Sequence, residues 1–382
     1  MSGWRCATDG VDGPRHQCAR FWVVRGPNRE GPSAMAITMI GVDTAKSVFQ
    51  VHGVDSAGKV QLKRKLRRDE LLPFFEKQEK CIVVIEACGA GHHWARVLTG
   101  LGHDVKLIAP EAVRPFVRKG KKNDPADAAA LCEAARRPGI KFVPIKTTEQ
   151  QAVLALHSVR SLLVKQETML ANAMRGLATE FGITVPKGMS KLEDLITLVD
   201  TDMSIPKSAR QAVGELPSHC GVVAARIAKL EVQIVDHARH DETARRLATV
   251  PGIGPITASL ISASVGDNIG AFKSARQFAA WLGLVPRQHS TGGKTRLGRI
   301  TKAGNKEIRK LLVLGATSMV YRAAQWNSAA GVWVRGVLER RPVRLATVAL
   351  ANKMARIAWA LMTRNEVYRA KGRVAATAGA AA

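Results

Sequence analysis

Four acidic residues have the types and positions that metal-dependent chemistry on phosphate esters needs. Asp43 and Glu86 each end a short apolar run, and Asp124 and Asp127 stand three residues apart in the segment Asn-Asp-Pro-Ala-Asp. Carboxylate oxygens are hard ligands that suit Mg²⁺, and a pair of such ions roughly 3.5–4 Å apart can clamp the attacking and leaving oxygens of a phosphodiester. The pattern predicts a carboxylate cluster that holds Mg²⁺, or Mn²⁺ in its place.

Each acid also has a simpler explanation. Asp124 fits the N-cap of a helix with Pro125 at its first position, and Asp127 then completes a motif that resembles a capping box. Asp43 and Glu86 could each be a strand-end acid that faces water. The combination favours the metal cluster, because the four acids occur together with a group of basic residues suited to phosphate: Arg114, Arg118, Lys119, Lys121 and Lys122.

An alternation of strands and helices between residues 37 and 145 must position these acids. The apolar runs that end in Asp43 and Glu86 can be adjacent central strands, which brings both carboxylates to one sheet edge. The early strands favour an antiparallel meander, and the later ones favour βαβ units. The sequence predicts an α/β domain with a mixed sheet and helices on its faces. Strands are expected at 37–43, 48–54, 59–65, 81–86, 104–108 and 141–145, and helices at 68–79, from the glycine turn at 89–91 to about 101, and at 124–135.

Two long helices are predicted next, at 147–181 and 207–247. In the first, leucines recur every seven residues at Leu156, Leu163, Leu170 and Leu177. Such a repeat is typical of a helix that packs on a neighbour and equally of a coiled-coil arm that joins two subunits. The second helix could be the antiparallel partner of the first.

A glycine turn begins the last part of the chain. In Pro-Gly-Ile-Gly-Pro at 251–255, the backbone N–H groups of Gly252 and Gly254 could hold a phosphate as a helix-hairpin-helix does. The alternative is a glycine-containing turn between two packed helices. Both remain open on the sequence.

A polar loop at 285–304 carries two neighbouring hydroxyls, Ser290 and Thr291, before a pair of glycines. Among basic residues, one hydroxyl could act as a nucleophile on a phosphodiester. The alternative is a flexible loop that contacts phosphate without chemistry. The basic residues of this region are Arg287, Lys294, Arg296, Arg299, Lys302 and Lys306.

The charge balance indicates a polyanionic partner. Lys and Arg number 58 against 31 Asp and Glu, a formal net charge of +27. Val285 to the C-terminus holds 19 of the basic residues and 3 of the acidic ones. No apolar run approaches the roughly 20 residues that span a bilayer, so nucleic acid is favoured over a membrane. The six cysteines show no zinc-site spacing, so structural zinc is not expected. Cys81 lies in an apolar run, which is typical of a reduced, packed thiol in a cytosolic protein.

Four segments together carry a resemblance to a known family: Gly-Val-Asp-Thr-Ala-Lys at 41–46, which includes Lys46, Ile-Glu-Ala at 85–87, Asn-Asp-Pro-Ala-Asp-Ala at 123–128 and Pro-Gly-Ile-Gly at 251–254. They resemble the DEDD transposases of insertion sequences, and specifically insertion-sequence family one-ten. The segment at 277–287 and the motifs Gly-Gly-Lys at 292–294 and Gly-Arg-Ile-Thr-Lys at 298–302 extend it over roughly 37–364.

The resemblance implies a division of roles. Asp43, Glu86, Asp124 and Asp127 would bind Mg²⁺ in an N-terminal α/β domain of the RNase-H/RuvC-like fold. A helical C-terminal domain would supply a serine nucleophile that forms a covalent intermediate with DNA. It also implies a structured bridge RNA that pairs with donor and target DNA, and a homo-oligomer with composite sites. Where the family has its serine, this chain has Thr291, with Ser290 one residue earlier; we favour Ser290 slightly as the nucleophile.

The predicted function is therefore an insertion-sequence transposase that cleaves and exchanges DNA strands with Mg²⁺ and an RNA guide. The alternatives are a RuvC-like junction resolvase or nuclease, and a helix-hairpin-helix DNA-binding protein without catalysis. The protein is expected in the bacterial cytoplasm, at the nucleoid when bound to DNA. The predicted parts are a disordered tail or over-extended start at 1–34, the catalytic domain at 35–146, a long-helix linker or oligomerisation region at 147–248, the transposase domain at 249–364 and a disordered tail at 365–382.

Overall fold

The chain forms two compact units that divide between Val143 and Pro144 in a computed structural model describing residues 36–117, 124–326 and 328–369. The tail predicted at 1–34, and most of the one predicted at 365–382, lie outside these ranges. Among the helices described, none combines the length and apolar character that crossing a bilayer requires. The two units are therefore considered separately.

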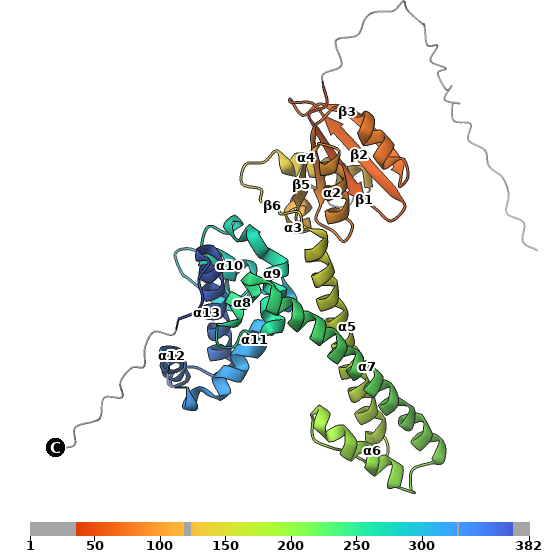
Figure 1. The fold of residues 1–382 in the computed structure, drawn as a ribbon, viewed down its shortest axis with the longest axis vertical. Helices are drawn as coiled ribbons and strands as arrows, with labels where there is room; N and C mark the ends of the chain where they lie inside the picture. The colour runs from red at the N-terminus through yellow and green to blue at the C-terminus, as the bar shows by residue number, and fades with distance from the viewer. Residues whose placement is uncertain (1–35, 118–123, 327, 370–382) are drawn as a thin grey trace, which may run out of the picture. The chain divides into compact units, whose positions relative to one another are not determined.

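A six-stranded mixed sheet is the centre of the first unit (Figure 1). Its strands follow the order β3-β2-β1-β4-β5-β6, and β4 pairs in parallel with both β1 and β5, whereas the other neighbours are antiparallel. This confirms the predicted mixed sheet. The strands are β1 (Met39–Thr44), β2 (Val48–Val54), β3 (Val60–Arg67), β4 (Ile82–Glu86), β5 (Asp104–Ile108) and β6 (Phe142–Val143).

Burial explains the strand sequences. The central strands β1 and β4 are covered on both faces, so they carry near-continuous apolar runs, whereas the edge strand β3 is rich in exposed Lys and Arg. The helix α4 packs on one face of the sheet. On the opposite face Trp94 of α2 meets Phe49 of β2 edge to face, with ring centroids 5.2 Å apart. The helices of this unit are α1 (Leu71–Lys77), α2 (Gly91–Gly100), α3 (Pro110–Val113), a 3₁₀ helix (Arg114–Phe116) and α4 (Asp124–Ala135).

The second unit is mostly helical and begins with a two-helix stem. α5 (Thr148–Thr179) and α7 (Lys207–His240) run side by side, with α6 (Leu192–Thr201) packed at one end (Figure 1). They are antiparallel, because Arg160 in the first half of α5 pairs with Glu231 in the last third of α7 at 2.6 Å, whereas Ala178 at the end of α5 shares a cluster with Val213 near the start of α7. The interpretation of α5 as a helix packed on an antiparallel neighbour is confirmed. Its role in joining subunits stays a prediction.

A buried polar cluster ties the stem to the helix α9. The hydroxyl of Ser259, which is fully buried, lies 2.9 Å from Nε2 of His157 in α5 and 3.0 Å from Nδ1 of His237 in α7. Burial, with smaller contributions from Arg160 and His237, lowers the pKa of His157 to about 4. The imidazole therefore stays neutral near pH 7, and the cluster joins three helices without a buried charge.

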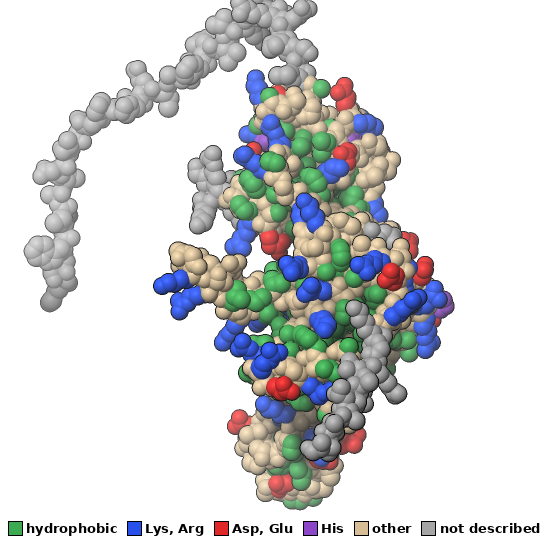
Figure 2. Space-filling view, turned by 90° about the vertical axis from the view of Figure 1, so that its left-hand side faces the viewer, with side chains coloured by type: hydrophobic (Ala, Val, Ile, Leu, Met, Phe, Trp, Pro, Cys, Tyr) green, Lys and Arg blue, Asp and Glu red, His purple; other side chains and the backbone are tan. Residues whose placement is uncertain are grey.

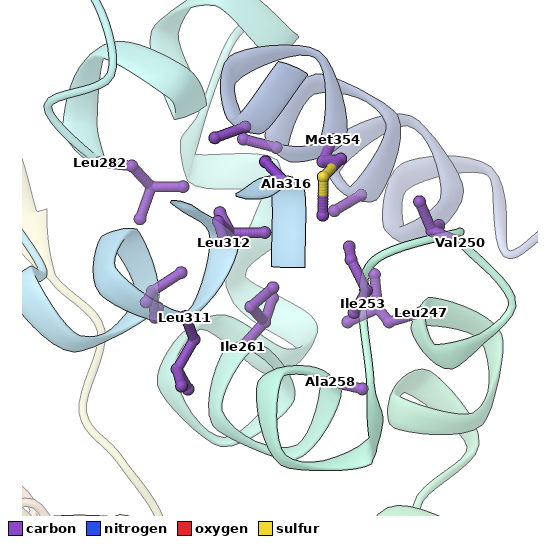
Figure 3. Packing of buried hydrophobic residues seen from close by; sticks show 14 of the residues in the cluster. Leu247, Val250, Ile253, Ala258, Ile261, Leu282, Leu311, Leu312, Ala316 and Met354 are labelled. Atoms are coloured by element: carbon purple, nitrogen blue, oxygen red, sulfur yellow. The ribbon is translucent and has the colours of Figure 1, made fainter. Parts of the chain in front are cut away.

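The remaining helices enclose one hydrophobic core, part of which is shown in Figure 3. The helix predicted at 207–247 is in fact two, because Asp241 leaves the helical conformation and its Oδ1 accepts a hydrogen bond from the Ala244 N–H at 2.6 Å, which caps a new helix. The helices are α8 (Glu242–Ala248), α9 (Pro255–Val265), α10 (Ala275–Trp281), α11 (Lys306–Tyr321), α12 (Ala329–Leu338) and α13 (Val343–Arg364), with short 3₁₀ helices at Met189–Lys191, Gly266–Ala271 and Ala323–Gln325 and a hairpin of β7 (Pro286–Gln288) and β8 (Leu297–Ile300).

Candidate functional site

Asp43 and Glu86 lie at equivalent positions on neighbouring parallel strands. The register of β1 and β4 aligns Gly41 with Val84 and Val42 with Ile85, so the next pair in that register is Asp43 and Glu86. Both carboxylates are partly exposed at the carboxyl edge of the sheet. Adjacent parallel strands thus bring two acids 43 residues apart in sequence to one edge.

Both acids share the face of the sheet that α4 covers. Side chains alternate along a strand, so Asp43 lies on the same side as Gly41, and Glu86 on the same side as Val84. A Cβ added to Gly41 would lie 2.3 Å from the carbonyl oxygen of Ala128 in α4. Val84 belongs to the hydrophobic cluster that includes Leu131 of the same helix. The two independent contacts agree that α4 faces these acids.

The direction of α4 brings its first turn toward the same edge. At the far end of the helix, Arg136 donates a hydrogen bond of 3.3 Å to the carbonyl of Ser56, just beyond the end of β2. That end of β2 pairs with Met39, the first residue of β1. α4 therefore runs antiparallel to β1, and its N-terminal turn, with Asp124 and Asp127, lies toward the strand ends that carry Asp43 and Glu86.

The loops behind the two strand ends are also in contact. The hydroxyl of Thr44, at the end of β1, lies 3.1 Å from the sulfur of Cys88, two residues after β4. This contact fixes the separation of the chain segments that follow Asp43 and Glu86. The edge is therefore held both by the strand register and by a side-chain contact beyond it.

The donor set fits a hard divalent cation. Carboxylate oxygens from two strand ends and a helix N-terminus are the ligand type that Mg²⁺ and Mn²⁺ take. Among the side chains that the structure describes, no three His, Cys, Asp or Glu form a group able to hold a metal ion; the side chain of Asp124 is outside that set. Asp127 is partly exposed. The roles of all four acids remain predictions.

The predicted basic residues of the first unit are only partly described. Lys46 is exposed just after β1, and its carbonyl accepts a hydrogen bond of 3.4 Å from Arg68. Arg114 is exposed in the 3₁₀ helix that follows α3. Arg118, Lys119, Lys121 and Lys122 lie outside the described residues.

The glycine turn between α8 and α9 packs into the core. Gly252 has φ +85, and a Cβ there would lie 2.9 Å from Met354 Cε and 3.3 Å from the carbonyl of Gly315. Figure 3 shows Leu247, Val250 and Ile253 around this turn, with Met354 beyond them. Gly254, in contrast, is exposed and precedes α9. Close packing by itself explains why residue 252 is a glycine. Phosphate binding by Gly252 and Gly254 stays a prediction.

The loop at 285–304 is a β-hairpin, which the sequence interpretation missed. Gly292 and Gly293 have φ +54 and +76, as a two-residue turn of type I′ requires, and the Lys294 N–H donates to the Thr291 carbonyl at 3.0 Å. The signal was available, since paired glycines between short strands are typical of such hairpins. Its strands β7 and β8 pair in an antiparallel register.

Ser290 and Thr291 are exposed near the tip of this hairpin. The amide of Gln288 donates a hydrogen bond of 3.0 Å to the Ser290 hydroxyl, whereas Thr291 forms the bridge that closes the turn. The segment from Val285 to Lys306 contains no acidic residue. Five predicted phosphate-binding residues are exposed on this segment: Arg287, Lys294, Arg296, Arg299 and Lys302.

Comparison with known proteins covers both units. Residues 40–183 match a family of transposases named for the DEDD motif and for IS110, and residues 244–331 match the Transposase IS116/IS110/IS902 family. The chain is 48% identical to a putative transposase of Sinorhizobium fredii, over 94% of this chain and 93% of that protein. It is 49% identical to a probable family 20 transposase of Pseudomonas aeruginosa (88% and 99%) and 38% identical to the transposase of insertion sequence element IS1111A of Coxiella burnetii (94% and 98%).

The Gly41 contact generates a first prediction. Gly41→Ala should destabilise the fold by about 1–3 kcal/mol, because its methyl group would overlap the Ala128 carbonyl and push α4 away from β1. Urea unfolding measures the effect. Gly89→Ala is the matched control, since an added Cβ at Gly89 meets nothing within 4 Å. Equal stability of the two variants would show that α4 does not depend on this contact.

Proposed function

The chain belongs to the IS116/IS110/IS902 family of transposases, and from this premise we propose that it moves an insertion sequence by cleaving and exchanging DNA strands at its four-acid site. A transposase is an enzyme that cleaves and recombines DNA. The observation that carries the proposal is the common register, edge and face of Asp43 and Glu86, with the first turn of α4 directed to them.

The four acids would act as ligands of divalent metal ions. Asp43 and Glu86 come from rigid central strands, and Asp124 and Asp127 from the first turn of α4, so the set is held by elements rather than by loops. Mg²⁺, or Mn²⁺, would supply Lewis-acid stabilisation of the charge that develops on the phosphate oxygens. The chain's own part is to orient the carboxylates, and the positive end of the α4 dipole favours negative charge at this edge of the sheet.

The hydroxyl of Ser290, or that of Thr291, is the proposed nucleophile. Its oxygen would form a bond to phosphorus while a sugar–phosphate ester bond breaks, and the leaving sugar oxygen would take up a proton. Ser290 is favoured on steric grounds, because Thr291 carries an extra methyl group and closes the hairpin turn. The cationic residues of the hairpin would hold the phosphate during this step.

Two other functions remain as alternatives. In a RuvC-like junction resolvase or nuclease the acids would activate water, and neither hydroxyl would bond to DNA. In a helix-hairpin-helix architectural protein, Gly252 and Gly254 would bind phosphate without strand cleavage. The packing of Gly252 against Met354 and Gly315 gives that turn a structural purpose and weakens the third interpretation.

Donor and target DNA, a structured guide RNA and a second copy of the chain are the proposed partners, in the bacterial cytoplasm at the nucleoid. The excess of basic residues suits nucleic-acid backbones, which gives affinity without sequence choice, and base pairing with RNA would supply that choice. For the oligomer, the support is a set of exposed apolar residues on the stem: Val159, Leu162, Met169 and Val232.

Removing one carboxylate should abolish strand cleavage. Asp43→Asn, Glu86→Gln, Asp124→Asn and Asp127→Asn should each lower the cleavage rate by about 10³-fold or more, since each removes a charged metal ligand. The rate is measured by the cleavage, in Mg²⁺, of labelled DNA that carries one end of the element. Addition of EDTA to the wild-type protein should lower the cleavage rate as much as these substitutions do. Asp104→Asn is the control, an exposed acid at the opposite edge of the sheet. Full activity of the Asp43 and Glu86 variants contradicts the four-acid site.

The nucleophile can be identified by the adduct that it forms. Cleavage should leave a protein–DNA adduct that survives denaturation, and Ser290→Ala should eliminate it while Thr291→Ala keeps at least a tenth of it. Denaturing gels with labelled DNA measure the adduct. The reverse result assigns Thr291 instead. Cleaved ends without any adduct would favour the nuclease, and intact DNA in Mg²⁺ would favour the architectural protein.

The partners are tested on protein purified from cells that carry the element with its flanking DNA. We expect one specific RNA to co-purify, and light scattering to give at least twice the chain mass. Leu162→Glu/Val232→Glu should lower that mass, because charges would then stand in the apolar contact. Recombination by RNA-free protein would refute the guide, and an active monomer would refute the oligomer.

A further inference from the structure

A groove of about 1360 Å³ runs along the outer face of α13. We call it the α13 groove and define it by its lining: α13 from Arg344 to Arg364, the base of the β7–β8 hairpin from Gly298 to Lys302, and Trp333 of α12. All of these elements belong to the second unit. None of the four acids and neither hydroxyl lines the groove, so it is separate from the residues proposed for catalysis.

α13 carries apolar side chains on its outer face as well as on its core face. The core face is buried with Leu350, Met354 and Ala358. The outer face carries polar Asn352, Lys353 and Arg356 and also lines the groove with the apolar side chains of Leu345, Val348, Ala349 and Ala360. Leu345 is 50% exposed. The floor of the groove is thus an apolar strip in contact with solvent.

The rim of the groove is cationic throughout. Six of its 19 described lining residues are Lys or Arg, and none is Asp or Glu. None of the six forms an ion pair with any described residue. The face drawn in Figure 2 shows this kind of surface, with blue basic side chains among green hydrophobic ones. The six are Arg299, Lys302, Arg344, Lys353, Arg356 and Arg364.

Two tryptophans are held in place along the groove. The ammonium of Lys353 lies 4.3 Å from the centroid of the Trp333 ring, and the indole N–H of Trp359 donates to the Phe272 carbonyl at 3.2 Å. Fixed aromatic rings on an apolar floor lose little conformational entropy when a flat ligand packs on them. They suit a ligand that has planar apolar parts as well as negative charge.

One rim residue is held in a strained conformation. Lys302 has φ +57, a left-handed conformation that is strained for a residue with a side chain, and its N–H donates to the carbonyl of Gly283 at 3.2 Å. The neighbouring Ala303 lies so close to Gly283 that a Cβ there would be 2.4 Å from its backbone nitrogen. The end of the hairpin is therefore clamped against the turn after α10, and this fixes the position of Lys302 on the rim.

We propose that the α13 groove binds an unpaired stretch of a polynucleotide strand, with its bases on the apolar floor and its phosphates on the cationic rim. A duplex stacks its bases on one another and presents only their edges, in its grooves, so the flat faces of its bases could not cover the apolar strip. An unpaired strand matches both features, because base stacking and phosphate contacts combine in such sites. DNA and RNA share this chemistry. The proposal goes beyond strand exchange, since it concerns binding of an unpaired strand along α13, and Arg299 and Lys302 are the only lining residues that also belong to the hairpin cations proposed to hold the phosphate.

Fluorescence anisotropy with the full chain and labelled oligonucleotides of about 12 nucleotides tests the groove. Oligo-dT or oligo-rU should bind about tenfold more tightly than an abasic strand of equal length, because only the former carry bases to pack on the floor. The two base-bearing probes also distinguish DNA from RNA as the preferred strand. Leu345→Ser/Val348→Ser should remove the preference for bases while leaving the affinity for the abasic strand unchanged.

The rim is tested by charge reversal. Arg344→Glu/Arg356→Glu should weaken binding of every probe by about tenfold, with a smaller salt dependence. Lys207→Glu/Lys229→Glu is the matched control, since it makes the same charge change at exposed positions of the stem. Thermal melts identify a variant that fails to fold. The rim proposal is overturned if Arg344→Gln/Arg356→Gln binds the oligonucleotides as tightly as the wild-type chain does.

Three results would overturn the groove as a strand-binding site. The first is equal affinity of the wild-type chain for oligo-dT, oligo-rU and the abasic strand. The second is equal affinity of the rim and control variants for these probes. The third is a change of molar mass in the rim variant without loss of affinity, which would make the groove an interface between copies of the chain. Asp43→Asn should keep full strand affinity while it loses cleavage. Failure of the groove and failure of the four-acid site are therefore distinguishable.

Discussion

The backbone contact between α4 and Gly41 is the constraint on which the first unit's site depends. Only a residue without a Cβ lets the carbonyl of Ala128 approach the strand this closely, since any side chain would place an atom 2.3 Å from it. At that distance the helix lies directly on β1, and the strand register decides which acids its first turn meets. Negative charges at one edge of the sheet repel one another, and the positive end of the α4 dipole, which is directed to that edge, offsets part of this repulsion. Divalent cations held by the four acids, as proposed, would offset the remainder.

Close backbone contact also organises the second unit. The glycine turn between α8 and α9 fits against Gly315 of α11, which packs the turn into the core, where it contributes Val250 and Ile253. The stem is joined to this core through the Ser259 hydroxyl, to which His157 and His237 are hydrogen-bonded. Because burial keeps His157 neutral, the joint avoids the cost of an isolated buried charge. Both units thus rely on small or neutral groups where elements approach most closely.

The charge of the chain is distributed so that attraction to polyanions is concentrated in the second unit. The hairpin and the α13 groove carry cations with no acid between Val285 and Lys306, and none of the six rim cations is paired with a described residue. Unpaired cations on adjacent surfaces add their fields and speed the association of a polyanion, with a strong dependence on salt. The apolar floor of the α13 groove lies among these cations, and it favours a polyanion whose bases can pack against it. The combination distinguishes an unpaired strand from a duplex, which charge alone cannot do.

The sequence by itself determined the local elements of the first unit and the identity of the candidate acids. Strands β2 and β5 and the helix α4 have the predicted bounds, because short runs rich in apolar residues between turn residues are typical of strands, and Asp124 followed by Pro125 is typical of a helix start. It did not resolve the break at Asp241, since the apolar pattern continues across it while a single capping side chain ends the helix. Only the tertiary structure decided that Asp127 lies toward Asp43 and Glu86, that Gly252 faces a core, and that the outer face of α13 lines a groove. These depend on which backbone surfaces approach each other, and contacts between residues far apart in sequence leave no local pattern by which they could be recognised.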